Sequence, residues 1–595
     1  MLLRTTSLHW DDLTGLFMAR KISTLFLRIL LMTKLLPLAA AIAMVFGTAH
    51  AAGSSATTIQ SGSGNTATTV QAGTNHTANI TTNTGTNSNA SIDQVGDAQT
   101  ADITQTGGVT SSSAIINQTV QSNTASINQV HMTNTTAEVN QNGLTNSANV
   151  DQQHVNDTSA TVQQDGNSND ADIRQYGFGI HNPAGSSITQ TGNGNVASSD
   201  QDTSTDALST IVQTGNNNTA DAEQMNGSER SEVWITQTTD GSDATAKQNN
   251  SADSNATINQ NSFSVGTASV TQTNGSLNTA LVTQTDFSSN ASATVTQNGS
   301  NNDVTTYQEH VFDTSLTVSQ DGNTNNATVN QEHVNDSTAS VNVTGDNNTS
   351  IIRQYGFGFH EPASATIITD GNLNNVNINQ DTSYMAAASV TQNGDSNVVV
   401  VTQLNESDDS VVTITQLDAS QSGDVNVAQN QAADSSATVA QSAVLGSMVD
   451  IDQGSGSMLI ANVMQTGSIG GSAKVLQEGL IQSTTVDQGG EGNMADVYQT
   501  ASDNIADVSQ FGDFGTADID QTGANNEGWV NQSGGEYNDA VIAQNGSDNY
   551  GIITQSGFGT ALAHNVASIT QNGMGDSASI TQSGGAGNTA GIIQN

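Results

Sequence analysis

Short stretches of this chain alternate between two sets of residues. The segment ASITQ occurs at residues 567–571 and again at 578–582, and in both copies Ala, Ile and Gln alternate with Ser and Thr. Strict alternation is typical of a β-strand, in which successive side chains point to opposite faces of the sheet. The pattern predicts short strands that have one face made of Ala, Ile and Gln and one face made of small polar residues.

The alternation recurs along the chain with a nearly constant spacing. A glutamine, mostly preceded two residues earlier by Ile or Val, returns in steps of mostly 11 or 12 residues from Gln60 to Gln594. These glutamines define 46 anchor positions, of which only Thr82, Val343 and Thr369 are not glutamine. Self-similarity at a fixed period is the signature of a repeat architecture.

Turn residues separate the predicted strands. In the fuller repeat a glycine follows the anchor by two positions and Asn or Asp follows by five, as in Gln297, Gly299 and Asn302, with Gly573 as another example. Glycine adopts backbone angles that other residues avoid, and Asn forms local turn bonds. One repeat therefore predicts one strand and one turn, and two repeats predict one coil of a solenoid. We expect an all-β fold, a single-chain β-solenoid of about 23 stacked two-strand coils, which continues over residues 52–595.

The inner face of such a solenoid contains the anchor glutamines. Identical amides stacked at about 4.8 Å can bond one another along the axis, because each has two donors and an acceptor. An isolated buried amide would cost about 1 to 3 kcal/mol. We therefore predict internal Gln and Asn ladders rather than exposed glutamines on a generic polar repeat. The predicted ladder residues include Gln297, Gln308, Gln320, Gln331, Gln571 and Gln582.

Composition alone would suggest a different kind of protein. The chain is 34% hydrophobic and 4% aromatic, and its formal charge of −45 is typical of a disordered polar chain. The unbroken repeat overrules that interpretation. Such a charge also argues against nucleic acid as a partner, and the absence of cysteine excludes a disulfide framework or thiolate metal site.

Catalytic chemistry has little support in the sequence. Outward carboxylates such as Asp520 are typical of a solvated face, on which they act as charged gatekeepers beside aggregation-prone strands. We expect no enzymatic activity and no cofactor. A polysaccharide-acting enzyme is the alternative, and it would need an acidic cluster together with basic residues in a groove.

The N-terminal 51 residues have the pattern of an export signal. Lys34 precedes an apolar run over residues 35–46, and small residues lead to a predicted cleavage site after Ala51. We expect Met32 to be the true start and the mature chain to lack a membrane span. The alternative is a tethering helix over residues 25–46.

The repeat Gln-x-Gly-x-x-Asn-x-Ala-x-x-x-Gln resembles the curlin repeat of curli subunits, which are secreted bacterial proteins that assemble into extracellular amyloid fibres. The resemblance covers residues 55–595. It implies a β-solenoid subunit of a fimbrium-like fibre at the cell surface, exported through an outer-membrane secretion pore and polymerised with a nucleator subunit. It also implies roles in biofilm matrix, cell aggregation and surface adhesion.

The repeats begin soon after Ala51 and reach the last residues of the sequence. We therefore expect uncapped strand edges and head-to-tail addition of further copies, a contact that does not close. The alternative function is a soluble acidic adhesin or ice-binding solenoid that stays monomeric. The runs TQT at 271–273 and 283–285 would supply the outward Thr-x-Thr of an ice-binding face.

A second, longer period lies within the first. IRQYGFGIH at residues 173–181 returns as IRQYGFGFH at 352–360, a shift of 179 residues. With the same shift the anchors of residues 105–237 map onto those of 284–416. The sequence therefore indicates that a block of several coils was duplicated.

Two kinds of side chain at the turns could carry function. Three longer steps contain Gly-Phe-Gly, and their aromatics Phe178, Phe357 and Phe558 either form sticky side loops or fold back over the solenoid. Four histidines follow an anchor by two positions and lie 23 residues apart in pairs, so that each pair is predicted to stack. They could bind a metal or respond to pH, or serve a plain turn role. These histidines are His131 with His154 and His310 with His333.

Overall fold

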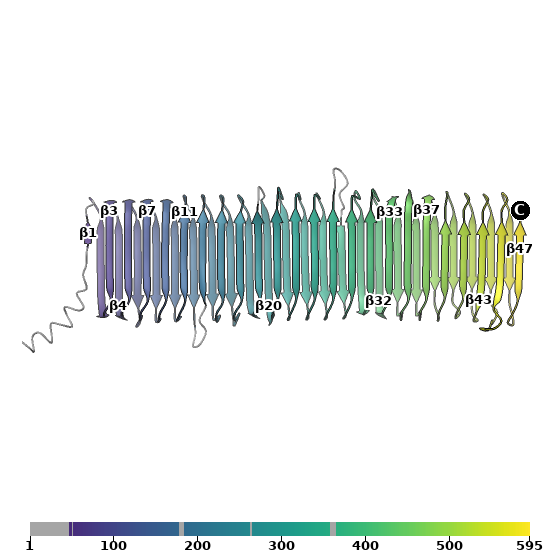
Figure 1. Ribbon diagram of the computed structural model, residues 1–595, viewed down its shortest axis with the longest axis horizontal. Coiled ribbons are helices and arrows are strands. Elements are labelled where there is room, and N and C mark those ends of the chain that lie inside the picture. The colour runs from purple at the N-terminus through teal and green to yellow at the C-terminus, as the bar shows by residue number, and fades with distance from the viewer. Residues whose placement is uncertain (1–46, 50–51, 178–183, 262–264, 357–363) are drawn as a thin grey trace, which may run out of the picture. The chain divides into compact units, whose positions relative to one another are not determined.

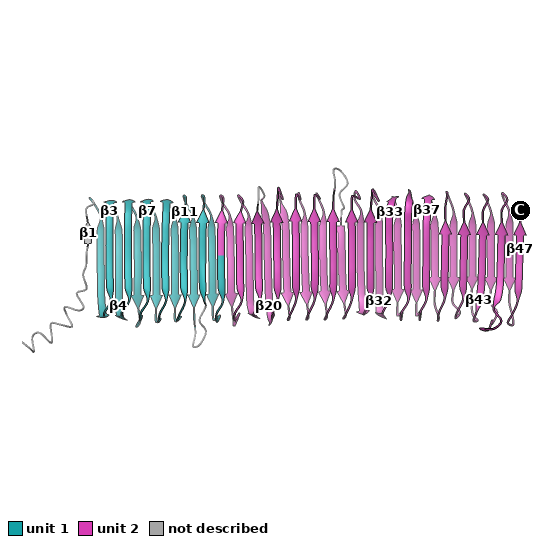
Figure 2. Cartoon of the chain, in the orientation of Figure 1, with its two compact units in different colours: residues 1–210 teal, residues 211–595 magenta. Residues whose placement is uncertain are grey.

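The computed structural model describes most of the predicted repeat region. Phe178, Phe357 and nearly all of the predicted signal region lie outside the described residues. The chain divides into two compact units, residues 1–210 and 211–595 (Figure 2). The described ranges are 47–49, 52–177, 184–261, 265–356 and 364–595.

Every regular element of the described ranges is a β-strand. None of these residues forms a helix long and apolar enough to span a membrane. The strands that lie within unit 1 are β1 (Gly47–Ala49), β2 (Ser55–Ser63), β3 (Thr66–Thr74), β4 (Thr77–Thr86), β5 (Asn89–Asp97), β6 (Thr100–Thr106), β7 (Ser113–Gln121), β8 (Thr124–Val130), β9 (Thr136–Leu144), β10 (Ser147–Gln153), β11 (Ser159–Asp165), β12 (Asp170–Tyr176), β13 (Gly185–Thr191) and β14 (Val196–Asp202). Strand β15 (Leu208–Thr214) includes the boundary between the units.

The strands that lie within unit 2 are β16 (Thr219–Met225), β17 (Glu232–Thr238), β18 (Asp243–Ala252), β19 (Asn255–Asn261), β20 (Gly266–Ser276), β21 (Thr279–Thr285), β22 (Ala291–Asn298), β23 (Asp303–Glu309), β24 (Ser315–Asp321), β25 (Asn326–Glu332), β26 (Thr338–Thr344), β27 (Thr349–Tyr355), β28 (Ser364–Asp370), β29 (Asn375–Asp381), β30 (Ala387–Asp395), β31 (Val398–Leu404), β32 (Val411–Gln421), β33 (Asp424–Ala433), β34 (Ser436–Ser442), β35 (Met448–Ser457), β36 (Ile460–Thr466), β37 (Ser472–Leu480), β38 (Ser483–Gln488), β39 (Met494–Gln499), β40 (Ile505–Gln510), β41 (Thr516–Gln521), β42 (Glu527–Gln532), β43 (Asn538–Gln544), β44 (Tyr550–Gln555), β45 (Asn565–Gln571), β46 (Ser577–Gln582) and β47 (Thr589–Gln594).

Within each unit, a strand pairs in parallel with the strand two places further along the chain (Figure 1). Odd-numbered strands therefore form one sheet and even-numbered strands form the other. The register keeps equivalent residues together, so that Gln284, Gln308 and Gln331 align on β21, β23 and β25. One strand of each sheet makes one coil, and strands β2 to β47 make about 23 coils. The predicted β-solenoid is confirmed.

The core of each coil consists of the residues that the alternation places inward. In β46, Ala578, Ile580 and Gln582 are buried, and Ser579 and Thr581 are exposed. Most other strands of both units repeat this pattern, with Ala and with Ile or Val stacked along the sheet. Burial of these apolar stacks supplies a stabilisation of about 25 cal/mol per Å², and the glutamine completes each inner face.

The two copies of the duplicated block are separated by an odd number of strands. Its first anchor, Gln105, lies on β6, and the equivalent Gln284 lies on β21. When a residue of the first copy lies on an even-numbered strand, its equivalent in the second copy therefore lies on an odd-numbered strand. Because both copies form regular strands in this way, the two halves of a coil are interchangeable.

Candidate functional site

The candidate functional site is the repeated interior, in which the anchor glutamines form ladders of hydrogen bonds. In unit 2 the ladder of the odd-numbered strands runs without a break from Gln213 to Gln594. At each step the Nε2 of one glutamine donates to the Oε1 of the next, over 2.8–2.9 Å. All bonds point in the same direction, so the ladder is polar along its length.

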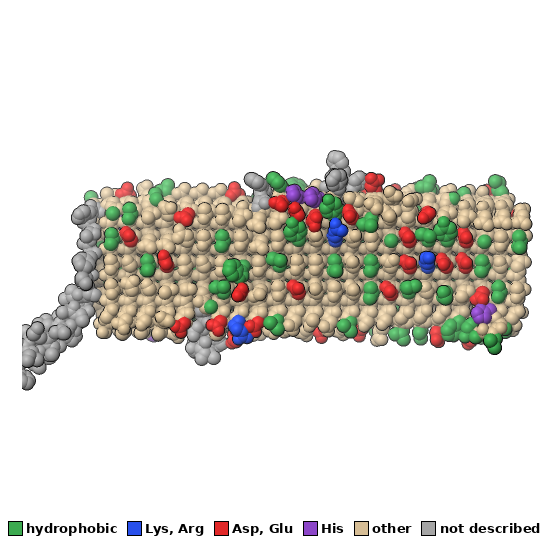
Figure 3. Space-filling view, in the orientation of Figure 1, with side chains coloured by type: hydrophobic (Ala, Val, Ile, Leu, Met, Phe, Trp, Pro, Cys, Tyr) green, Lys and Arg blue, Asp and Glu red, His purple; other side chains and the backbone are tan. Residues whose placement is uncertain are grey.

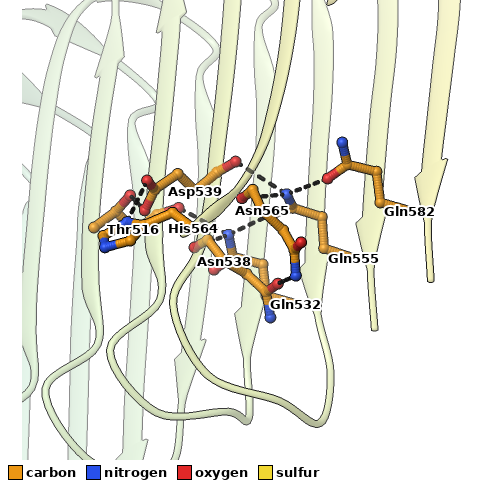
Figure 4. A network of polar contacts seen from close by, with 8 residues as sticks. All are labelled: Thr516, Gln532, Asn538, Asp539, Gln555, His564, Asn565 and Gln582. Atoms are coloured by element: carbon orange, nitrogen blue, oxygen red, sulfur yellow. Dashed lines mark hydrogen bonds and ion pairs between the residues drawn. The ribbon is translucent and has the colours of Figure 1, made fainter. Parts of the chain in front are cut away.

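Each carboxamide also joins the two sheets. The Nε2 of Gln555 donates to the Oε1 of Gln582 over 2.8 Å (Figure 4). It also donates to the carbonyl oxygens of Asp539 and Asn565, which belong to the opposite sheet, over 3.0 Å each. The Oε1 of Gln555 accepts from Gln532. The buried amide is thus fully partnered, as a low-dielectric interior requires.

The ladder of the even-numbered strands in unit 2 has one interruption. It runs from Gln224 to Gln320 and resumes from Gln392 to Gln582, with bonds of 2.6–3.2 Å. Between the two stretches, Val343 and Thr369 occupy the glutamine position in register. The ladder is therefore broken over two coils.

Unit 1 contains two shorter ladders of the same kind. One joins six glutamines from Gln71 to Gln190 and the other joins five from Gln105 to Gln201, with bonds of 2.7–2.9 Å. The hydroxyl of Thr82 donates to the Oε1 of Gln105 over 3.4 Å, so that this replacement keeps a weak ladder contact.

The six glutamines singled out by the sequence all lie in these ladders. Gln308, Gln331 and Gln571 belong to the odd-strand ladder of unit 2. Gln297, Gln320 and Gln582 belong to its even-strand ladder.

A second ladder, made of asparagines, fixes the turns. The backbone N–H of Asn325 donates to the Oδ1 of Asn302 over 3.0 Å. The Nδ2 of Asn302 donates over 2.8 Å to the carbonyl oxygen of Gly322, which lies in the turn of the next coil. The Asn ladder predicted from the sequence is confirmed. The bond from the Asn302 side chain to a turn carbonyl of the next coil was not predicted, because the sequence assigned Asn at this position only local turn bonds.

Gly299 is required by the stacking as well as by its backbone angle, and Gly573 is required by the carboxylate beside it. Gly299 has φ of +106°, and a Cβ there would lie 2.0 Å from the carbonyl oxygen of Gly322. At Gly573 a Cβ would lie 2.6 Å from the carboxylate of Asp576. The carbonyl oxygen of Gly573 accepts from the Nδ2 of Asn549 over 3.2 Å. A side chain at either glycine would therefore displace a neighbouring polar group.

The turns that contain a histidine lack the glycine and the buried asparagine of the other turns. The rings of His131 and His154 are stacked with their centroids 5.0 Å apart, and those of His310 and His333 are stacked with their centroids 4.7 Å apart. All four histidines have left-handed backbone angles. The residue after each histidine is apolar and buried. These four apolar residues are Met132, Val155, Val311 and Val334.

Carboxylates distinguish the two histidine pairs. Glu309 Oε1 lies 3.5 Å from His310 Nδ1, and Glu332 follows on the next coil. The equivalent residues of the first pair are Val130 and Gln153. Among the described residues no group of three or more His, Asp or Glu side chains is placed to hold a metal ion.

Aromatic side chains gather at one turn side of unit 2. Phe558 is 68% exposed in its loop. Phe514 stacks on Tyr537 at 5.1 Å, and Tyr537 contacts His564 at 5.3 Å. The His564 Nδ1 lies 2.8 Å from the carboxylate of Asp539, which anchors the loop to β43 (Figure 4).

The outer face seen in Figure 3 carries carboxylates spread among neutral side chains. Some are half-buried between neighbouring side chains. Partial burial raises the pKa of Asp487 and Asp520, and partial burial with the nearby charge of Asp487 raises the pKa of Asp507. These carboxyls therefore resist ionisation on the folded sheet.

The family model for the curlin associated repeat matches residues 483–512, which cover strands β38, β39 and β40. No curated protein matches the chain. The family match confirms the resemblance that the glutamine spacing indicates.

Proposed function

We propose that this protein, whose chain carries a curlin associated repeat, is a secreted structural subunit of curli-like extracellular amyloid fibres. In this role it supports biofilm matrix, cell aggregation and surface adhesion. Its partners are further copies of itself, a nucleator subunit and an outer-membrane secretion pore. The repeat and the β-solenoid fold favour a structural role over an enzymatic one.

The polarity of the amide ladders carries the proposal. Every interior coil of unit 2 offers at least one glutamine Nε2 donor toward one neighbour and one Oε1 acceptor toward the other, as Gln308 does between Gln284 and Gln331. The backbone ladder has the same polarity, because all strands pair in parallel. A coil of a second copy can therefore be stacked with the bonds that already join coils within the chain. Such heterologous stacking makes a filament rather than a closed ring.

Outward carboxylates suit a subunit that must stay soluble before assembly. The formal charge of −45 makes side-by-side contact between copies unfavourable at neutral pH. Stacking along the axis involves few outward side chains. The charge therefore favours end-to-end growth over lateral aggregation.

Seeded polymerisation of the purified chain tests the proposal. Thioflavin fluorescence is followed with and without preformed fibres, and the product is examined by fibre diffraction. We expect a lag that seeds shorten, with reflections near about 4.7 and 10 Å. A β-rich chain that stays monomeric with seeds would contradict the fibre role and favour the soluble adhesin or ice-binding alternative.

A further inference from the structure

Two buried polar atoms lie without a protein partner where the even-strand ladder of unit 2 is interrupted. Thr369 is 2% exposed and Gln392 is fully buried. Neither the Thr369 hydroxyl nor the Gln392 Oε1 makes a hydrogen bond to another protein group. Buried polar atoms in folded proteins are nearly always partnered, by protein or by ordered water.

The first copy of the duplicated block shows which group this place normally holds. Gln190 is the equivalent of Thr369, and its Oε1 accepts from Gln164 over 2.8 Å. Its Nε2 donates to the carbonyl oxygen of Asp170 over 2.9 Å. In the second copy the equivalent carbonyl is that of Thr349. Thr369 lacks the carboxamide that would reach it.

We propose that an ordered water molecule is bound at this position between Thr369 and Gln392. The water accepts from the Thr369 hydroxyl and donates to the Gln392 Oε1 and to the Thr349 carbonyl oxygen. Three hydrogen bonds are the usual number for a buried water. A water molecule is smaller than the carboxamide that it replaces, so the shorter threonine leaves room for it.

The neighbouring replacement places the water on the Gln392 side of the interruption. Val343 is 1% exposed and offers no polar side-chain atom. On the far side of Val343, the Gln320 Oε1 accepts from the Gln297 Nε2 over 3.2 Å. The Gln320 Nε2 donates to the carbonyl oxygen of Asp303 over 3.4 Å. The first stretch of the ladder therefore ends against an apolar side chain, and the second begins at the water.

The variant T369V tests the proposal by the sign of its effect. Valine has nearly the shape of threonine but lacks the hydroxyl. With water bound, T369V removes one of its three partners, and we expect the denaturation midpoint of the full chain to fall. A dry site would leave the wild-type hydroxyl unpaired, and T369V would then raise the midpoint. A raised midpoint overturns the proposal.

Thr484 provides the matched control for the loss of a hydroxyl. It is fully buried, and its hydroxyl donates directly to the Oε1 of Gln499 over 2.8 Å. The same hydroxyl accepts from the Nε2 of Gln477 over 3.2 Å. T484V should lower the midpoint, which shows that the assay detects the loss of one buried hydroxyl with its two hydrogen bonds.

High-resolution density of the full chain supplies an independent reading. We expect a peak within hydrogen-bond distance of both the Thr369 hydroxyl and the Gln392 Oε1, and its loss in T369Q, in which the carboxamide takes the place of the water. Density that shows other buried waters but none here contradicts the proposal.

Discussion

The two glutamine ladders of unit 2 have the same surroundings but differ in continuity. On the odd-numbered strands every amide from Gln213 to Gln594 has a ladder partner. On the even-numbered strands Val343 and Thr369 interrupt the row, and the Oε1 of Gln392 loses its ladder donor. The strands continue in register through the interruption. The ladder therefore adds stability and polarity to a coil whose register other contacts also hold.

Breaking the continuous ladder should have the largest effect. The substitution Gln308→Leu leaves the Gln284 Nε2 and the Gln331 Oε1 without ladder partners and offers no hydroxyl to hold a water. The Gln284 Nε2 still donates to the carbonyl oxygens of Thr267 and Ala291, so it loses one hydrogen bond of about 0.5 to 1.5 kcal/mol, whereas the Gln331 Oε1 is orphaned at about 1 to 3 kcal/mol. The sum predicts a loss of about 1.5 to 4.5 kcal/mol in local stability. Native-state hydrogen exchange of β21 to β25 measures it.

Gln421 is the control for that substitution, because its side chain is exposed in the same unit. Q421L should change stability by no more than about 0.5 kcal/mol. Equal effects of Q308L and Q421L would contradict the role given to the ladder.

Weakening the asparagine ladder beside the interruption should have the next largest effect. Asn348 donates from Nδ2 to the carbonyl oxygen of Gly371 over 2.8 Å and accepts from the Asn374 N–H over 2.9 Å. Because the glutamines are missing at this level, Asn348→Ala should cost about 1 to 3 kcal/mol and expose the amides of β26 and β28 to exchange. The exposed Asn326 is the control, and N326A should leave exchange unchanged.

Repairing the interrupted ladder should give a smaller gain. In V343Q/T369Q the row of carboxamides from Gln320 to Gln392 becomes continuous. Three restored bonds at about 0.5 to 1.5 kcal/mol each, less about 1 to 2 kcal/mol for the lost apolar burial of Val343, predict a net gain of about 1 to 2 kcal/mol. Denaturant titration against the wild-type chain detects it, and a fall in the midpoint would show that valine and threonine are the better fit.

Acid should stabilise the outer faces slightly and leave the ladders intact, since amides do not titrate. The folded pKa of Asp487, Asp507 and Asp520 is raised above the ordinary 3.8. Their contribution to stability is therefore fully present below pH 3.8 and is lost as the pH rises through the raised values.

Thermal unfolding from pH 7 down to pH 3.8 measures this gain at the acidic end, and D507N should reduce its size. A pH dependence that D507N leaves unchanged would show that Asp507 is not among the groups responsible.

The sequence was sufficient to predict the solenoid and the glutamine ladder, because both follow from one strand's alternation and one repeat's spacing. It marked Val343 and Thr369 as exceptions but not the orphaned atom of Gln392, which depends on which residue lies on the next coil. Local turn chemistry explained Gly299 without its close approach to Gly322, and the predicted Asn ladder did not include the bond from Asn302 to the Gly322 carbonyl oxygen. The raised pKa of Asp507 depends in the same way on Asp487 of a neighbouring strand.

The most direct test of the central claim is a solid-state NMR measurement of contacts between glutamine side chains in isotopically diluted samples. Labelled chains are mixed with an excess of unlabelled chains, and transfer is followed from the Nε2 of one glutamine to the carboxamide carbon of the next. The ladder joins glutamines 22 to 27 residues apart in one chain, so we predict that the contacts persist on dilution. Contacts that fade in proportion to dilution would show that glutamines stack between chains, and would contradict the solenoid.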